Sequence, residues 1–229
     1  MSHDQEYDLE YVESRNLKMD DTFLFGCKGC GNCCRNRKEP IAITACDFYY
    51  IVKAFDMTGD DVMKKITSVD TAQNTHLPTI YLRERQDGSC RLLRKGRCMI
   101  QEVKPVVCRL FPLGRYFDLR DNSFHYFSQD FACKGLKQTI RVGDWIEAFH
   151  LPEIEEESIY WGRLHLAATK YMLDIFKKDT LKSIDFFFAY LYAFFIDVDA
   201  TRTCMQNLES GYEKLKKEYR GFDFFEYRG

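Results

Sequence analysis

The 229-residue chain contains little glycine and proline, 13 and 5 residues, and this scarcity excludes collagen-like and low-complexity proteins. It also has little net charge: 33 Lys and Arg stand against 35 Asp and Glu, so it has no overall attraction to nucleic acid or acidic lipid. The longest apolar stretch, residues 186–196, is much shorter than the ~20 residues that span a membrane. We therefore expect a soluble protein that binds neither membranes nor nucleic acid.

Signals for export and for several common enzyme classes are also missing. Residues 1–6 are acidic where a secretion signal would be basic and then apolar, so we expect a cytoplasmic protein. The chain has no phosphate-binding loop, dinucleotide fingerprint or serine-nucleophile elbow. His76, His125, His150 and His165 lack the spacing of metal ligands, and we interpret them as structural or surface residues. Catalytic residues therefore stay unknown, and the sequence leaves open whether the protein is an enzyme.

Cysteine is the residue type that the chain has in excess. Nine of its ten cysteines lie between Cys27 and Cys133, and Cys204 is the exception. In a reducing compartment cysteines persist as thiols or metal thiolates rather than disulfides. Small buried hydrophobic residues would be scattered along the chain, so the clustering favours metal ligands.

The sequence divides into three regions. Residues 1–24 are charged and lack periodicity, so we expect a loosely packed N-terminal arm. Residues 25–140 form the cysteine-cluster metal-binding region, and residues 141–229 carry long helical patterns. The expected fold class is α+β, with a small irregular cysteine-rich metal-binding lobe packed on a mostly helical C-terminal lobe.

Local patterns within the cysteine-rich region predict two helices and several short strands. Apolar residues at helical spacing predict a helix over 44–55, and Thr44 with Asp47 resembles a capping box at its start. A second helix is predicted over 60–66. We expect short strands at 80–82, 91–93, 113–118 and 124–127, with a hairpin turn at 121–123.

The C-terminal region is predicted to be helical. Pro152 and the glutamates after it are typical of a helix start. Residues 186–196 are apolar on all sides, which predicts a central buried helix. A stripe from Met205 to Tyr219 predicts a last helix that packs on the same core.

The strongest motif is Cys27-x2-Cys30-x2-Cys33-Cys34. A two-residue spacing lets a tight turn direct two sulfurs at one metal site, and the glycines between them let the backbone curl and aim amide groups at sulfur. The first three cysteines match the opening of a bacterial ferredoxin site, whereas the Cys-Pro that continues such a site is absent. Adjacent side chains point in different directions, so Cys33 and Cys34 serve different sites, or one of them serves none.

Further ligands must come from the cysteines that follow this motif. Cys90 and Cys98 flank a short basic segment that resembles a knuckle or hairpin. Cys108 lies between two prolines that stiffen the chain, and Cys133 precedes Lys134-Gly135. The candidate metal ligands are therefore Cys27, Cys30, Cys33, Cys34, Cys90, Cys98, Cys108 and Cys133.

Together these segments resemble the YkgJ-type cysteine-cluster family, which is described as a zinc- or iron-chelating domain. The resemblance covers about residues 25–136 and implies a metal site more firmly than a reaction. Lys104 departs from the Arg-Pro pair usual in the family, which keeps the charge but loses the planar fork. Cys46 and Cys204 lie outside the pattern, and we expect neither to be a ligand. The flagellin lysine methylase is similar across the cysteine region alone.

Basic residues surround the candidate ligands. Residues 25–140 hold 19 Lys and Arg against 12 Asp and Glu, and we expect the cations to offset the charge of the thiolates. A nucleic-acid surface is the alternative, and the lack of aromatic residues within the basic run disfavours it. The cations nearest the ligands in sequence are Arg35, Arg37, Lys38, Arg91, Arg94, Lys95, Arg97 and Arg109.

Three functions remain open. The first is an iron–sulfur protein, with a 4Fe-4S cluster in a redox or reaction-supporting role, and the C-x2-C-x2-C spacing favours it because three thiolates can hold three corners of a cubane. The second is a structural zinc-binding module that mediates interactions, and the third is a lysine-methylase-like enzyme. Thiolate ligands suit both zinc and iron–sulfur centres, so the sequence leaves open the metal, the number of sites, and whether the partner is a protein or a small molecule.

Overall fold

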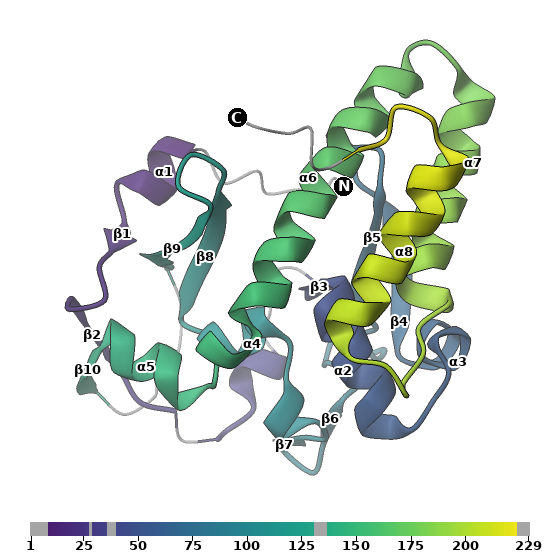
Figure 1. The fold of residues 1–229 in the computed structure, drawn as a ribbon. Coiled ribbons are helices and arrows are strands. Elements are labelled where there is room, and N and C mark those ends of the chain that lie inside the picture. The colour runs from purple at the N-terminus through teal and green to yellow at the C-terminus, as the bar shows by residue number, and fades with distance from the viewer. Residues whose placement is uncertain (1–8, 28, 36–39, 131–136, 224–229) are drawn as a thin grey trace. The chain divides into compact units, whose positions relative to one another are not determined.

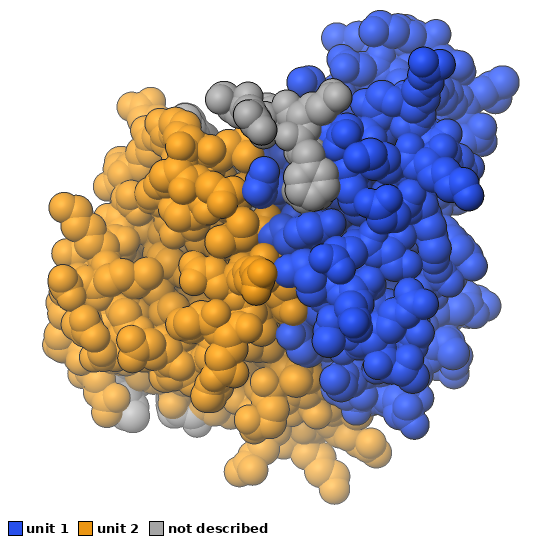
Figure 2. Space-filling view, in the orientation of Figure 1, with its two compact units in different colours: residues 1–4, 40–83, 160–229 blue, residues 5–39, 84–159 orange. Residues whose placement is uncertain are grey.

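The computed structural model describes residues 9–27, 29–35, 40–130 and 137–223 and has the predicted α+β fold. It divides into two compact units, coloured separately in Figure 2. Unit 1 comprises residues 1–4, 40–83 and 160–229, and unit 2 comprises residues 5–39 and 84–159. Each unit therefore combines segments that are distant in the sequence, whereas the boundaries of the three sequence regions stay a prediction.

Small antiparallel sheets organise unit 2. Strand β9 (Ser123–Ser128) lies between β1 (Asn16–Leu17) and β8 (Leu113–Asp118), β2 (Thr22–Phe25) pairs with β10 (Gln138–Arg141), and β6 (Leu93–Arg94) pairs with β7 (Arg97–Cys98). In the β8–β9 hairpin Tyr116 pairs with His125, and Asn122 takes a left-handed turn conformation with φ of 57°. The strands and the turn predicted over 113–127 are confirmed, while the strand predicted at 91–93 is displaced to β6.

The predicted loosely packed arm is wrong for the part that the structure describes. Residues 9–25 form α1 (Leu9–Glu13), β1 and β2, and Val12 is buried. Strands β1 and β2 pair with strands more than 100 residues further along the chain, Asn16 with Phe127 and Phe25 with Gln138. Strands this short contain too few residues to show a periodic pattern. Their stability comes from remote partners, which the local sequence does not reveal.

An aromatic cluster supports the segments that lead to the cysteines in unit 2. The ring of Phe25, at the end of β2, lies edge-on to Phe111 and Trp145, with centroids 5.7 and 5.5 Å away. The indole nitrogen of Trp145 donates a hydrogen bond of 3.1 Å to the Leu110 carbonyl. These contacts join β2 to two helices, α4 (Val106–Leu110) and α5 (Val142–Ala148). The remaining helical segments of unit 2 are η1 (Asn32–Cys34), η2 (Gln101–Val103) and η3 (Pro152–Ile154).

Unit 1 contains a three-stranded antiparallel sheet and most of the helical residues. Strand β5 (Pro78–Leu82) lies between β3 (Ala42–Ile43) and β4 (Thr67–Thr71). Helix α6 (Glu155–Phe176) begins in unit 2 and continues in unit 1. The other helices are α2 (Ala45–Phe55), α3 (Gly59–Lys65), α7 (Thr180–Leu191) with its π-helical extension η4 (Tyr192–Ile196), and α8 (Cys204–Glu218), which packs beside α7 (Figure 1).

Local signals placed α2 correctly. The amide of Asp47 donates to the Thr44 hydroxyl at 3.1 Å, and the amide of Thr44 donates to the Asp47 carboxylate at 3.0 Å, which completes the predicted capping box. Phe48, Ile51 and Val52 are fully buried. The helices predicted at 60–66, after Pro152 and through the stripe from Met205 are also confirmed.

The predicted central buried helix over 186–196 is wrong in one respect. Phe186 and Tyr190 are fully buried, whereas Phe188 is 60% exposed and Tyr192 is 55% exposed. The segment is helical but buries only one face. Its apolar composition predicted burial on all sides, because composition reports hydrophobicity and not the number of neighbours. In the described residues no helix is both long and apolar enough to cross a membrane.

Candidate metal centre

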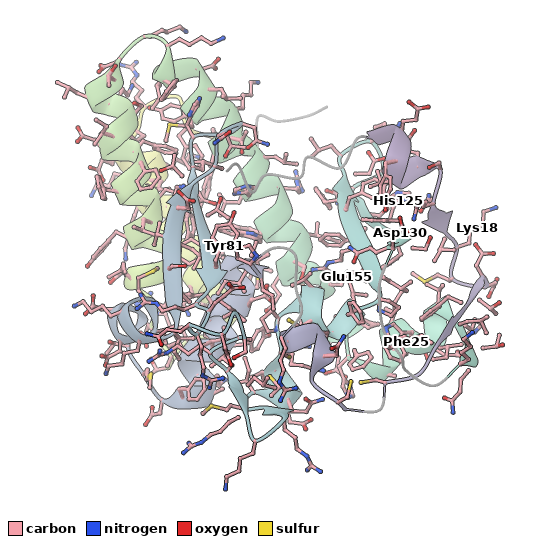
Figure 3. The ribbon with its side chains drawn as sticks, turned by 180° about the vertical axis from the view of Figure 1, so that it is seen from behind. Lys18, Phe25, Tyr81, His125, Asp130 and Glu155 are labelled. Atoms are coloured by element: carbon pink, nitrogen blue, oxygen red, sulfur yellow. The ribbon has the colours of Figure 1, made fainter. Side chains whose placement is uncertain are left out.

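The first cysteine motif forms a loop that leaves the end of β2. Figure 3 labels Phe25 at this end, two residues before Cys27. Gly29 and Gly31 have φ of 65° and 68°, conformations that favour glycine. The amide of Gly29 donates a hydrogen bond to the Cys27 sulfur at 3.4 Å. The expected curl, with an amide directed at sulfur, is confirmed at this position.

Gly31 brings the cysteine loop against the β6–β7 hairpin. A Cβ atom on this residue would lie 3.1 Å from the Gly96 carbonyl oxygen and 3.2 Å from the Leu93 side chain. Arg35 reaches back along the loop, where its guanidinium donates to the Cys30 carbonyl at 3.0 Å. The absence of a side chain at Gly31 therefore allows the close approach of two cysteine-bearing segments.

A backbone hydrogen bond connects the same two segments. The amide of Cys90 donates to the Cys34 carbonyl at 2.7 Å. Cys34 closes the short helix η1, and the Cys90 carbonyl accepts further hydrogen bonds from the Leu93 amide and the Arg85 guanidinium. Cys34 and Cys90 are thereby held at the junction of the loop and the hairpin.

The thiol of Cys34 lies at the centre of a group of cysteines. Its pKa is raised far above the ordinary value, first by a hydrogen bond with Cys33, then by burial, and then by the nearby thiols of Cys33, Cys108 and Cys90. Like charges repel, so a thiolate there is unfavourable unless a cation is bound. Cys34 is the point where three of the motif-bearing segments meet.

Cys98 belongs to the same group. Burial raises the pKa of its thiol, and the thiols of Cys90 and Cys33 raise it further. The amide of Ile100 and the charge of Lys104 oppose this shift. The structure therefore brings together five predicted ligands, which are Cys33, Cys34, Cys90, Cys98 and Cys108.

Three predicted ligands remain. Cys27 and Cys30 are exposed, and Cys133 lies outside the described residues. Among the described candidates, no three sulfurs lie within 4.8 Å of one another. The set of eight ligands therefore stays a prediction, with five members gathered in space. The donor set fits a soft metal or an iron–sulfur cluster, because it consists of thiols alone.

The basic residues near the cysteines have different roles from those expected. Arg109 is buried and braces the chain around Cys108, donating to the Lys104 carbonyl at 2.6 Å and to the Phe149 carbonyl at 3.3 Å. Lys104 is the cation that opposes the rise in the pKa of Cys98. Four basic residues of the hairpin segment are exposed to solvent: Arg91, Arg94, Lys95 and Arg97. Arg37 and Lys38 lie outside the described residues.

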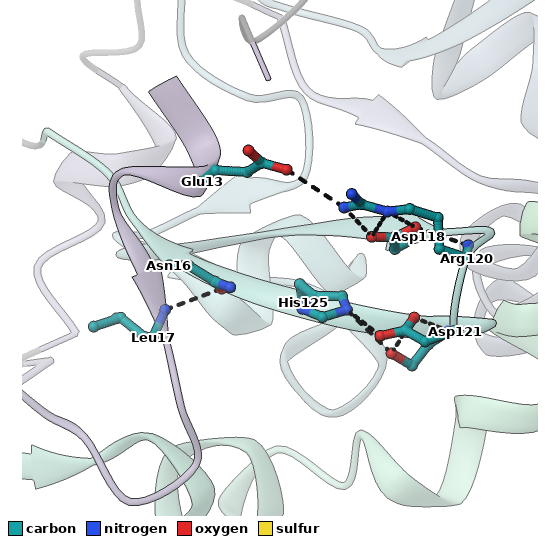
Figure 4. A network of polar contacts seen from close by, with 8 residues as sticks. Glu13, Asn16, Leu17, Asp118, Arg120, Asp121 and His125 are labelled. Atoms are coloured by element: carbon teal, nitrogen blue, oxygen red, sulfur yellow. Dashed lines mark hydrogen bonds and ion pairs between the residues drawn. The ribbon is translucent and has the colours of Figure 1, made fainter. Parts of the chain in front are cut away.

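A second group of possible ligands lies on the β8–β9 hairpin and was missed from the sequence. Ligand atoms of Asp118, Asp121 and His125 lie within 4.8 Å of one another (Figure 4). Arg120 binds the Asp118 carboxylate through two nitrogens, at 2.9 and 2.6 Å, and lowers the pKa of Asp118 to about 2. His125 contacts Asp121 at 2.7 Å. These polar groups satisfy each other, so we assign them to the hairpin turn rather than to a metal.

One comparison with known proteins matches the part of the chain that carries the cysteine motifs. Residues 26–133 match the model of a family described as "CxxCxxCC: Putative zinc- or iron-chelating domain". The match covers slightly less than half of the chain. It includes all eight candidate cysteines, and Cys133 is its last residue. No curated protein and no solved structure matches the chain. The resemblance noted in the sequence is confirmed, and it supports metal binding without distinguishing zinc from iron.

Proposed function

Because residues 26–133 carry the CxxCxxCC domain, we propose that this protein holds a thiolate-ligated iron–sulfur cluster, of the 4Fe-4S type, in a redox or reaction-supporting role. The observation that carries the proposal is a group of five cysteines in unit 2: the thiols of Cys33, Cys90 and Cys108 lie near Cys34, and Cys98 lies near Cys33 and Cys90. When bound, such a cluster supplies one-electron chemistry or a Lewis-acidic iron.

The chain's own groups fit the charge of a cluster site. The Gly29 amide stabilises negative charge on the Cys27 sulfur, as the amide hydrogen bonds to sulfur in such sites do. Lys104 favours the thiolate form of Cys98. The buried Arg109 fixes the backbone on either side of Cys108. These groups hold and orient ligands on three separate segments.

The spacing of the cysteines in the sequence supports a cluster over a single zinc ion. Cys27, Cys30 and Cys33 follow the C-x2-C-x2-C pattern, and three such thiolates can hold three corners of a cubane.

Absorption spectroscopy of the anaerobically purified protein tests this proposal. We expect a brown protein whose broad absorption in the visible range is bleached by dithionite. Cys34→Ser should abolish that absorption, while Cys204→Ser in unit 1 should retain it. A colourless protein with bound zinc, prepared in the same way, would contradict the proposal.

The β6–β7 hairpin favours a second candidate function, a zinc-binding module that docks an acidic protein. Arg91, Arg94, Lys95 and Arg97 are exposed, and none forms an ion pair within the described part of the chain. Side chains that end in nitrogen project from this hairpin into solvent (Figure 3). Met99, at its base, is 45% exposed and adds an apolar contact. Cations around an apolar residue fit an acidic protein surface better than nucleic acid, because the hairpin has no aromatic side chain for base stacking.

Fluorescence anisotropy with a labelled glutamate-rich peptide tests this second candidate. The charge reversal Arg94→Glu with Lys95→Glu should weaken binding at least tenfold, while Lys177→Glu with Lys178→Glu, a matched pair of exposed lysines in unit 1, should leave it unchanged. Equal binding by both variants would refute the docking surface. Tighter binding to an RNA oligonucleotide through the same hairpin would favour nucleic acid instead. No observation on the described residues favours the lysine-methylase-like alternative.

A further inference from the structure

Two cysteines outside the motif lie together in unit 1. Cys46 is the second residue of α2, and Cys204 is the first residue of α8. Each is 3% exposed, and their sulfurs lie within 4.8 Å of each other. They are far apart in the sequence, so the fold creates this pair.

Several interactions fix the two helix starts relative to each other. Complete capping boxes form at Thr44 with Asp47 and at Thr203 with Gln206, so both first turns are well defined. The Tyr49 hydroxyl donates to the Arg202 carbonyl at 2.8 Å and joins α2 to the residues just before α8. The approach of the two thiols is therefore built into the framework of unit 1.

A small cavity borders one of the two cysteines. It has a volume of about 10 Å³ and is lined by Tyr49, Cys204, Asn207 and Leu208, among others. This is about the room that one water molecule needs. Cys204 therefore borders a space about the size of one water molecule, and bulky thiol reagents do not fit into it.

We propose that Cys46 and Cys204 are a redox-active dithiol that hydrogen peroxide converts to a disulfide. The Cys204 sulfur attacks one peroxide oxygen, which breaks the O–O bond, gives a sulfenic acid and releases water. The Cys46 sulfur then attacks the Cys204 sulfur, which forms the S–S bond and releases a second water. Two thiols lose two electrons and two protons, and one peroxide is reduced to two waters.

The disulfide would join the starts of α2 and α8 without involving the cysteines of unit 2. It closes a long loop of chain between Cys46 and Cys204, which restricts the unfolded state and raises stability. Oxidation of this pair is thus separable from metal loss, because the two groups of thiols belong to different units.

Peptide mass spectrometry tests the proposal on the purified, metal-loaded protein. We would add about one equivalent of hydrogen peroxide, block the remaining thiols with N-ethylmaleimide in denaturant, and digest without reductant. The expected product is a peptide pair joined through Cys46 and Cys204, accompanied by a rise of several degrees in Tm. In Cys46→Ser the joined peptides should disappear, and dimedone should label Cys204 as a sulfenic acid.

The wild-type measurement decides the outcome even if a variant folds poorly. Recovery of Cys46 and Cys204 as N-ethylmaleimide adducts, after peroxide has oxidised other cysteines, would overturn the proposal. Dimedone labelling of Cys46 rather than Cys204 in the single-serine variants would overturn the order of the two steps. Metal content should be the same in Cys46→Ser and in the wild type, and a lower value would show that Cys46 is a metal ligand instead.

Discussion

The amide nitrogen of Cys90 donates a hydrogen bond to the carbonyl oxygen of Cys34, and their separation is 2.7 Å. This contact joins two cysteine-bearing segments that the sequence separates, and it does so through backbone atoms. The two side chains take no part in this bond. The loop and the hairpin of unit 2 therefore help to position the candidate centre.

Substitution of a gathered cysteine should affect metal content and stability together. Cys108→Ser is expected to lower bound metal and to lower the free energy of unfolding, because formation of a metal site and folding are coupled. Cys204→Ser should leave metal content unchanged. Elemental analysis and thermal denaturation of both variants provide the measurement, and full metal content in Cys108→Ser would exclude a ligand role for this residue.

The contact between the cysteine loop and the hairpin can be tested at Gly31. Gly31→Ala places a methyl group 3.1 Å from the Gly96 carbonyl oxygen in a residue with φ of 68°. We expect a loss of about 1–3 kcal/mol of stability from backbone strain and displacement, with weaker metal binding.

Gly88→Ala is the matched control for Gly31→Ala. Gly88 has φ of 73°, but a Cβ there meets nothing within 4 Å. This variant should show the backbone strain alone and should keep its metal. Equal loss of metal in both alanine variants would show that the contact at Gly31 is not what holds the loop in place.

The stability of the protein should depend on the shape of the Arg109 side chain as well as on its charge. Arg109→Lys keeps the charge but cannot make both hydrogen bonds, to the Lys104 and Phe149 carbonyls. We expect the free energy of unfolding, measured in urea, to fall by about 1–3 kcal/mol, because a partly buried carbonyl loses its donor. The exposed Arg94→Lys serves as the control, and the prediction fails if the two lysine variants are equally stable.

The stability of unit 1 should fall in mild acid because of His165. Its Nδ1 lies 2.8 Å from the Tyr190 hydroxyl, and burial lowers its pKa from 6.5 to about 4. Above pH 6.5 both the folded and the unfolded states are neutral at this residue, so the contribution is complete. Between pH 6.5 and about 4 only the unfolded state binds the proton, so stability is lost as the pH falls.

The expected loss over this pH range is about 2–3 kcal/mol. Urea unfolding at a series of pH values should show this slope in the wild type and a flatter one in His165→Asn. The same slope in His165→Asn and in the wild type would assign the effect to other groups.

The sequence predicted elements that depend on neighbouring residues and missed those that depend on remote ones. The Thr44 and Asp47 capping box and the turn at Asn122 are local, and both were predicted correctly. The pairing of Asn16 with Phe127 needs a partner from far along the chain, so it left no local pattern. The exposure of Phe188 was missed because hydrophobic composition does not reveal which face lacks neighbours.

The candidate site was predictable in kind and less so in arrangement. Clustered thiols and the Cys-x2-Cys spacing indicate a metal, and they do so because few other roles need that pattern. The sequence could not reveal that Cys34 forms the meeting point, since Cys90 and Cys108 reach it through the fold. Nor could it assign Arg109 to bracing the backbone rather than to balancing charge.

The content of iron and acid-labile sulfide in anaerobically purified protein tests the central claim most directly. A 4Fe-4S cluster predicts about four iron and four sulfide per chain, and both should be lost together in Cys34→Ser. About one zinc per chain with neither iron nor sulfide would contradict the cluster and favour the structural zinc module.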